Sequence, residues 1–142
     1  MKITTDDYAK LLLRIALGAI LFAHGALKLF VFTPAGTVGF FASLGLPAVA
    51  AYMTIVGELA LGALLILGVA TRLSALLSVT ILSGATWVHI DNGWLFSNQG
   101  GGWEFPAMLV LVAVVVAILG AGRFALWNGQ RIESGRLGVV LS

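Results

Sequence analysis

Four long apolar stretches dominate this sequence and constrain its fold more than any other feature. They run over Leu11 to Phe32, Ala48 to Ala70, Leu73 to Ile90 and Phe105 to Ala121. A bilayer core requires about 20 consecutive apolar residues per helix, with a range of about 17–25, so each stretch meets or approaches that length. The sequence therefore predicts an all-α fold, an integral membrane four-helix transmembrane bundle.

The composition excludes the main alternatives. Of the 142 residues, 60% are hydrophobic and 10% are charged, whereas an average soluble domain is roughly 45–50% apolar and about 25% charged. Such a chain has too few polar residues to cover a water-facing surface, which excludes a soluble globular domain, a disordered chain and a nucleic-acid-binding module. The chain contains no cysteine, so any redox chemistry must use a bound cofactor or a partner.

One membrane domain is expected over residues 1–126, with helices at about 9–32, 48–70, 72–90 and 105–121. A cytoplasmic juxtamembrane tail is expected over residues 127–142. The first helix is interpreted as retained rather than as a cleaved signal peptide, because it is longer than the apolar region of a signal and carries internal charges.

Basic residues fall on one side of this arrangement. They lie before or at the start of the first helix, in the second loop and after the last helix: Lys2, Lys10, Arg14, Arg72, Arg123, Arg131 and Arg136. The loops over residues 33–47 and 91–104 contain neither lysine nor arginine. Because positively charged short loops remain cytoplasmic, both termini are predicted to be cytoplasmic and these two loops external.

Glu58 is the most informative charged residue inside the apolar stretches. It lies about ten residues into the second predicted helix, or roughly 15 Å at 1.5 Å per residue, which is near the middle of a bilayer. An ionisable group there is costly and is retained only if it is paired, lines a wet cavity or takes part in chemistry. Glu58 is therefore either a proton-exchanging or ligand-binding carboxylate, or one half of a structural ion pair.

His24 and Lys28 share one face of the first predicted helix because they are four residues apart. Since the first two helices run in opposite directions, His24 and Glu58 are expected at similar depths in the outer half of the membrane, with Lys28 closer to the surface. A His–Glu–Lys cluster could move protons or bind a polar headgroup such as a quinone carbonyl. The alternatives are a snorkelling Lys28 and a hydrogen-bonded structural His24.

Further polar and aromatic residues are expected at the external mouth. They are His89, Asp91, Glu104, Trp87, Trp94 and Trp103. His89, Trp87 and Glu104 are candidate ligand-binding residues. Glu104 is equally well explained as an acidic residue at a helix N-terminus, and the tryptophans as an interfacial belt or as a stacking wall for a planar ligand.

Several other sites are disfavoured. Arg14 and Arg72 are interpreted as topology signals that snorkel to the cytoplasmic surface. The sequence has no phosphate-binding loop, no dinucleotide fingerprint and no His-Glu-x-x-His pair, so no metal is predicted. Haem ligation by His24 and His89 is disfavoured because the two histidines are expected at different depths.

The chain resembles the DoxX family of small bacterial and archaeal membrane proteins over about residues 11 to 126. The residues that carry the resemblance are, in chain order, Leu12-Leu13-Arg14 with Leu17-Gly18, His24-Gly25 with Lys28-Leu29-Phe30, Gly39-Phe40-Phe41, Leu44-Gly45-Leu46-Pro47, Glu58, Leu67-Gly68 with Thr71-Arg72, His89 with Gly93, Gly101-Gly102-Trp103-Glu104-Phe105-Pro106, and Gly122-Arg123. The sequence departs from the family pattern at Trp103, where a tyrosine is expected, and at Ala121, where proline is frequent.

This resemblance implies a multi-pass protein of the bacterial inner membrane, with relatives linked to quinol oxidases and to thiosulfate:quinone oxidoreductases. The leading hypothesis is a quinone-interacting subunit of a membrane oxidoreductase complex, with Glu58, His24 and Lys28 as the reactive groups. The alternatives are a small-molecule or proton-coupled transporter, and a non-catalytic assembly or scaffold protein. The expected partners are the lipid bilayer and either further copies of the chain or the other subunits of a redox complex, with no nucleic acid.

Overall fold

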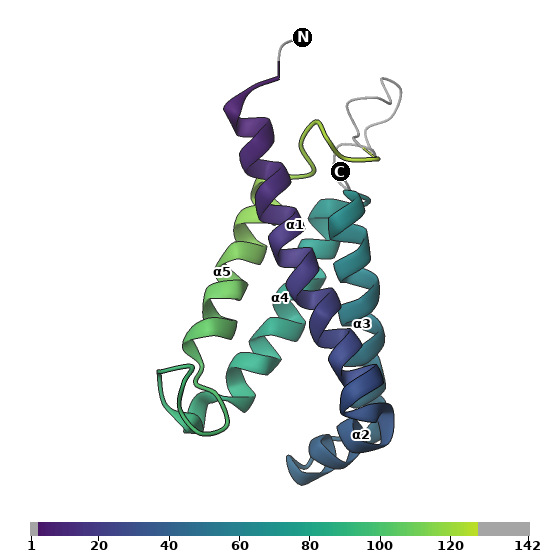
Figure 1. Cartoon of the computed structure of the whole chain (residues 1–142), viewed down its shortest axis with the longest axis vertical. Helices are drawn as coiled ribbons and strands as arrows, with labels where there is room; N and C mark the ends of the chain where they lie inside the picture. Colours follow the sequence, from purple (N-terminus) through teal and green to yellow (C-terminus); the bar gives the residue numbers. More distant parts are fainter. Residues whose placement is uncertain (1–2, 128–142) are drawn as a thin grey trace.

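The computed structural model describes residues 3–127, and every regular element in this part of the chain is helical (Figure 1). Helix α1 (Thr5–Ala26) continues into a π-helical turn, η1 (Leu27–Val31). The other elements follow in the order α2 (Thr33–Ser43), α3 (Ala48–Leu67), α4 (Thr71–Val88), the 3₁₀ turn η2 (Ile90–Asn92) and α5 (Glu104–Leu119).

The structure has five α-helices over these residues, so the prediction of four was wrong. The additional helix is α2, which occupies most of the segment 33–47 that was predicted as a loop. Its Pro34 lies in the first turn, where a missing N–H costs no hydrogen bond, so the proline that suggested a break instead begins a helix. The break is one residue earlier, at Thr33, whose φ is 62°.

The other helix boundaries lie close to those predicted. Helix α1 begins earlier than residue 9, because Thr4 and Asp7 form a reciprocal capping box. Helix α3 ends at Leu67 and not at residue 70, because Gly68 takes a left-handed conformation that caps the helix. The predicted tail, residues 127–142, lies outside the described residues except for Trp127.

The helices form two pairs, in which α1 packs along α3 and α4 packs along α5. The pairs meet through α3 with α4 and through α1 with α5. Figure 1 shows them close together at the end that carries the N-terminus and diverging toward the end that carries α2 and the loop after α4. This divergence leaves side chains from four helices facing one another at the latter end.

Glycines allow the close approach of α1 to α3. A Cβ atom added to Gly62 would lie 2.6 Å from the backbone nitrogen of Phe22 and 2.8 Å from the carbonyl oxygen of Gly18. A Cβ atom on Gly18 would in turn lie 2.8 Å from the carbonyl oxygen of Gly62. Since backbone atoms on both sides make these contacts, neither helix can move a side chain aside to accept a larger residue.

Gly62→Ala is therefore expected to destabilise the protein relative to Gly84→Ala. Both substitutions gain helix propensity, but a Cβ atom on Gly84 would meet nothing within 4 Å, whereas one on Gly62 overpacks the α1–α3 contact at a typical cost of about 1–3 kcal/mol. Thermal unfolding of the two variants in the same detergent measures the difference. Equal midpoints would contradict the close packing of α1 on α3.

Outward-facing surfaces of the long helices are apolar. Large hydrophobic side chains are exposed on α3, α4 and α5, including Tyr52, Met53, Val56, Leu76, Leu77, Met108, Leu111 and Ile118. Within the described residues, Thr5–Val31 and Ala48–Leu67 are long and apolar enough to cross a membrane, and α5 is a shorter apolar helix. Exposed apolar area of this extent marks a lipid-facing or partner-facing surface rather than a surface in water.

Arg14 joins three segments at the end of the molecule that carries the N-terminus. Its side chain is only 2% exposed, and its Nη1 donates hydrogen bonds to the carbonyl oxygens of Leu65, at 2.9 Å, and Ile66. Its Nη2 donates to the carbonyl oxygen of Phe124, at 3.0 Å. The expectation that Arg14 snorkels to the surface was therefore wrong, because its buried guanidinium donates to carbonyl oxygens at the C-terminal end of α3 and after α5.

Candidate functional site

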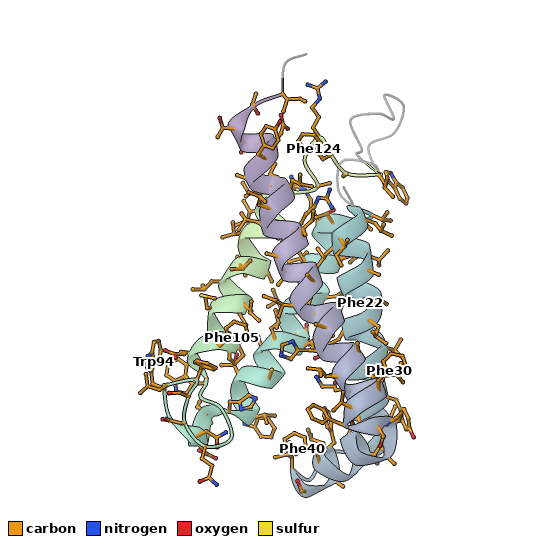
Figure 2. All side chains as sticks on the ribbon, viewed as in Figure 1. Phe22, Phe30, Phe40, Trp94, Phe105 and Phe124 are labelled. Carbon is orange, nitrogen blue, oxygen red and sulfur yellow. The ribbon has the colours of Figure 1, made fainter. Side chains whose placement is uncertain are left out.

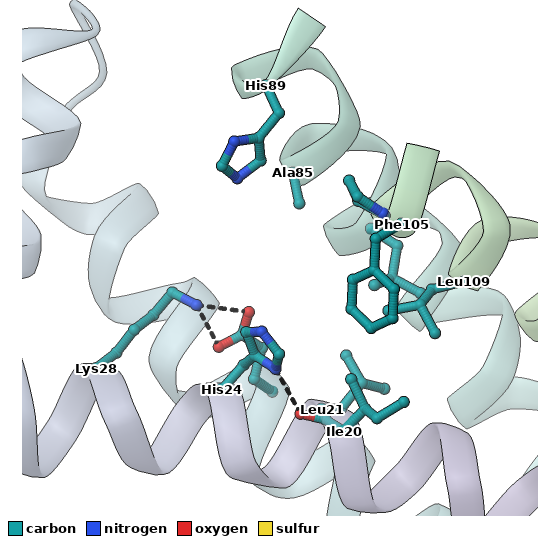
Figure 3. A pocket seen from close by; sticks show the side chains of 11 residues that line it. Ile20, Leu21, His24, Lys28, Ala85, His89, Phe105 and Leu109 are labelled. Carbon is teal, nitrogen blue, oxygen red and sulfur yellow. Dashed lines mark hydrogen bonds and ion pairs between the residues drawn. The ribbon is translucent and has the colours of Figure 1, made fainter. Parts of the chain in front are cut away.

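A cavity of about 140 Å³ lies between the two helix pairs, where they diverge (Figures 2 and 3). Its walls come from α1 with η1, from α3, from α4 with His89, and from α5. The lining residues are Ile20, Leu21, His24, Lys28, Glu58, Leu82, Ala85, His89, Phe105, Pro106 and Leu109. Four polar groups therefore face an otherwise apolar space, as in many small-molecule sites.

Lys28 and Glu58 form an ion pair between η1 and α3. Lys28 Nζ lies 2.8 Å from both carboxylate oxygens of Glu58, and only 6% of Glu58 is exposed. The sequence predicted Lys28 closer to the external surface than Glu58, on the neighbouring helix, and the structure brings the two side chains into direct contact. A buried carboxylate with a bidentate cationic partner is tolerated where an unpaired one would not be.

Gly25 and the π-helical turn position Lys28 toward Glu58. A Cβ atom on Gly25 would lie 2.8 Å from Leu59 Cγ and 3.1 Å from Glu58 Cβ, so this glycine lets α1 contact α3 at the level of the carboxylate. In η1, Phe32 N donates to the carbonyl oxygen of Leu27, at 2.9 Å. Insertions of this kind re-aim side chains and are frequent at functional sites.

Thr37, which the sequence analysis did not single out, links α2 to the same turn. Its side chain is buried, and its hydroxyl lies 3.3 Å from the carbonyl oxygen of Lys28 and 3.0 Å from that of Thr33. The only sequence signal for this contact is a threonine in a short segment that otherwise reads as a loop. Helix α2 therefore supports the backbone that carries Lys28.

His24 lies beside this ion pair on α1. Its Nδ1 is 2.8 Å from the carbonyl oxygen of Ile20, and its ring is close enough to Glu58 for electrostatic interaction. The predicted His–Glu–Lys cluster is thus present as a set of neighbouring side chains.

His89 faces the cluster from the opposite wall (Figure 3). Its Nδ1 is 3.2 Å from the carbonyl oxygen of Gly101, in a loop that Asn92 holds through hydrogen bonds to Gly100 and Gly101. His24 and His89 line the same cavity, the first from within α1 and the second from the end of α4. Helix α4 is shorter than predicted and ends at Val88, which leaves His89 free to turn inward.

Two other predicted ligand-binding residues do not line the cavity. Trp87 is 55% exposed on α4. Glu104 Oε1 accepts a hydrogen bond from Phe96 N, at 2.8 Å, and so closes the loop before α5. Trp94 and Trp103 stack edge to face, with ring centroids 4.5 Å apart, and stabilise that loop. The apolar wall from α5 is made instead by Phe105, Pro106 and Leu109.

The cavity can hold a small ring but not a large cofactor. Pockets for drug-sized ligands occupy about 300–1,000 Å³, so 140 Å³ suits the head of a molecule whose remainder lies outside. Within residues 3–127, no three histidine, aspartate or glutamate side chains are grouped so that they could hold a metal ion. The arrangement can hydrogen-bond the polar edges of a planar ring between apolar walls.

Comparisons with known proteins are consistent with a membrane protein of one family. A family model described as DoxX matches residues 9–90. A relative from Bacillus subtilis (strain 168), named "Putative oxidoreductase CatD", is 34% identical over 121 residues, which cover 84% of this chain and 85% of the relative. A protein of Haemophilus influenzae named "Uncharacterized protein" is 38% identical over 71 residues, covering 49% of this chain and 45% of that protein. No solved structure matches.

Proposed function

The chain belongs to the DoxX family of membrane proteins, and from that premise we propose that its cavity binds the headgroup of a quinone. The protein would act as a subunit of a membrane oxidoreductase complex. One observation carries this proposal, namely the bidentate Lys28–Glu58 pair and two histidines on facing walls of a small apolar cavity.

The chemistry of a quinone suits these walls. A quinone is a flat, largely apolar ring with polar oxygens on opposite edges, and its long tail is soluble in lipid. Apolar side chains such as Phe105 and Leu109 can contact the ring faces, while His24 and His89 approach its edges from α1 and α4. The small volume accommodates the ring and leaves the tail outside, among the exposed apolar faces of the helices.

Two observations support a redox role, namely the name of a relative and the absence of cysteine from this chain. CatD carries the name of an oxidoreductase, and this chain covers most of its length. Because the chain has no cysteine, it supplies no thiol of its own, so electrons would pass between the bound ring and a partner protein. The residues of this chain would bind the ring and exchange its protons through His24 and Glu58.

The proposed topology has four spans, formed by α1 with η1, α3, α4 and α5, in the bacterial inner membrane. Helices α4 and α5 contain 18 and 16 residues, or about 27 Å and about 24 Å at 1.5 Å per residue, close to the hydrocarbon thickness of about 30 Å. Helix α2 would then lie at the external surface. The distribution of basic residues supports cytoplasmic termini.

Single-cysteine labelling tests this topology. The native chain has no cysteine, so any label on the protein reports the introduced residue. In intact cells, Ser43→Cys and Asn98→Cys are expected to react with a membrane-impermeant maleimide, since both residues would be external. Thr4→Cys is expected to react only after permeabilisation. The reverse pattern, or labelling of all three in intact cells, would overturn the four-span arrangement.

Mass spectrometry of lipids that co-purify in mild detergent tests the proposed function. Wild type and Glu104→Gln are expected to retain a quinone, since Glu104 lies outside the cavity lining, whereas Glu58→Gln is expected to lose it. The matched substitution controls for the loss of one carboxylate. Retention of the same quinone by all three proteins, or by none of them, would contradict the proposed site.

A further inference from the structure

The hydrogen bonds of the two cavity histidines fix which ring nitrogen carries the hydrogen. His24 Nδ1 lies 2.8 Å from the carbonyl oxygen of Ile20. A carbonyl oxygen only accepts hydrogen bonds, so Nδ1 is the donor. The neutral His24 ring therefore carries its hydrogen on Nδ1 and a lone pair on Nε2.

The same assignment follows for His89 from its neighbour Asn92. Asn92 Nδ2 has two hydrogens, and it lies 3.1 Å from the carbonyl oxygen of Gly100 and 2.9 Å from that of Gly101. Neither hydrogen is left for His89 Nδ1, which is 3.4 Å away. His89 Nδ1 therefore donates to Gly101, at 3.2 Å, and its Nε2 also carries a lone pair.

The cavity thus presents two hydrogen-bond acceptors from facing walls. Within residues 3–127, neither Nε2 atom has a hydrogen-bond partner, although both rings line the cavity. Lys28 Nζ has three hydrogens and contacts both oxygens of Glu58, which leaves one donor beside the two histidine acceptors. The polar edges of the cavity are therefore suited to a ligand that donates hydrogen bonds.

We propose that the site binds the reduced, hydroxyl-bearing form of its ring, an aromatic diol, more tightly than the oxidised quinone. Each hydroxyl would donate to one Nε2 atom, from α1 on one side and from His89 on the other. A quinone would instead direct two carbonyl oxygens toward two lone pairs. This inference rests on the proposed quinone function. It adds which redox form of the ligand binds more tightly to the site.

Titration of the purified full-length protein with both redox forms of one ligand tests the inference. A short-chain benzoquinone and its hydroquinone are compared under anaerobic conditions in the same buffer and detergent. A reductant is added only to the hydroquinone titration, where it cannot alter the protein's thiols because the chain contains no cysteine. We expect the dissociation constant of the hydroquinone to be at least about tenfold lower than that of the quinone, since sites built to pair with a hydroxyl discriminate strongly against analogues that lack it.

The variants His24→Asn and His89→Asn assign the preference to the two rings. An asparagine amide can keep the donor to Ile20 or Gly101 near the position of Nδ1, but it removes the Nε2 acceptor. Each variant is expected to lower the preference for the hydroquinone by about threefold or more. Preserved preference in both variants would overturn the assignment to the histidines.

The wild-type titration separates this inference from the proposed function. If neither redox form binds, the quinone function itself fails. If both forms bind equally, or the quinone binds more tightly, the quinone function stands and the inference about the reduced form is wrong. Tighter binding of the hydroquinone together with its loss in the asparagine variants supports both.

Discussion

Lys28→Met is expected to destabilise the protein by about 3 kcal/mol, because it leaves the buried Glu58 carboxylate without the cation that contacts both of its oxygens. Removing one partner of a buried ion pair typically costs about 3–5 kcal/mol. The lower end applies here since 20% of the Lys28 side chain is exposed. Unfolding in mixed detergent micelles, followed by circular dichroism, measures the change.

The double variant Lys28→Met/Glu58→Gln separates structure from function. Replacing both charges removes the unpaired group, so stability is expected to return to within about 1 kcal/mol of wild type, as for a directly coupled pair. Quinone retention is expected to remain lost. A double variant that is stable and still retains quinone would show that the pair only joins η1 to α3, which is the structural alternative.

Arg14→Met is expected to lower the free energy of unfolding by about 3 kcal/mol or more. The substitution removes the guanidinium donors from the carbonyl oxygens of Leu65, Ile66 and Phe124. Leu65 keeps a hydrogen bond from Gly68 N at 3.2 Å, and each buried group that is left unsatisfied costs about 1–3 kcal/mol. It also removes a positive charge from the C-terminal end of α3, where the helix dipole favours one. Arg14→Lys is expected to recover only part of the loss, because an ammonium lacks the planar fork of a guanidinium.

Arg72→Met is the matched control for this prediction. Arg72 begins α4 at the same end of the molecule and is only half-buried, so its removal is expected to change stability by less than about 0.5 kcal/mol. Thermal melts of the three arginine variants in one detergent provide the comparison. Similar losses for Arg14→Met and Arg72→Met would contradict the role of Arg14 as a link between α3 and the segment after α5.

The charged part of the site could be predicted from the sequence because few alternatives exist inside an apolar helix. Glu58 is retained only if it is paired, lines a wet cavity or takes part in chemistry, and the antiparallel course of the first two long helices brings Lys28 near it, although closer to the surface. The four-residue spacing then adds His24 to the same face. Helical periodicity and the energetic cost of a buried charge therefore predicted the cluster, and the structure decided between an ion-paired and a snorkelling Lys28.

The rest of the site depended on details that periodicity does not contain. The inward position of His89 follows from the end of α4 at Val88 and from the loop fold around Gly101. Helix α2 was missed because Pro34 and the glycines near it are typical of a loop, whereas Pro34 occupies a first helical turn. The apolar wall residues, such as Phe105 and Leu109, could not be predicted from the sequence. Apolar residues lie on every face of α5, so no periodicity indicates which face lines the cavity.

Arg14 shows a further limit of sequence reasoning. An arginine near the end of an apolar stretch ordinarily reaches water at the membrane surface, and nothing in the local sequence distinguishes the buried case. Its burial depends on two segments far along the chain, the end of α3 and the residues around Phe124. A contact of this kind becomes visible only once the tertiary structure is known.

Photoaffinity labelling tests the central claim, a quinone ring bound between α1, α3, α4 and α5, most directly. A short-chain azidoquinone is activated by light in the presence of the purified protein, and the labelled peptides are mapped by mass spectrometry. We expect label within residues 20–28, 82–89 and 105–109, and we expect this label to be lost when unlabelled quinone competes. Label confined to the outward apolar face around Tyr52 and Met53, or label that competitor does not reduce, would contradict it.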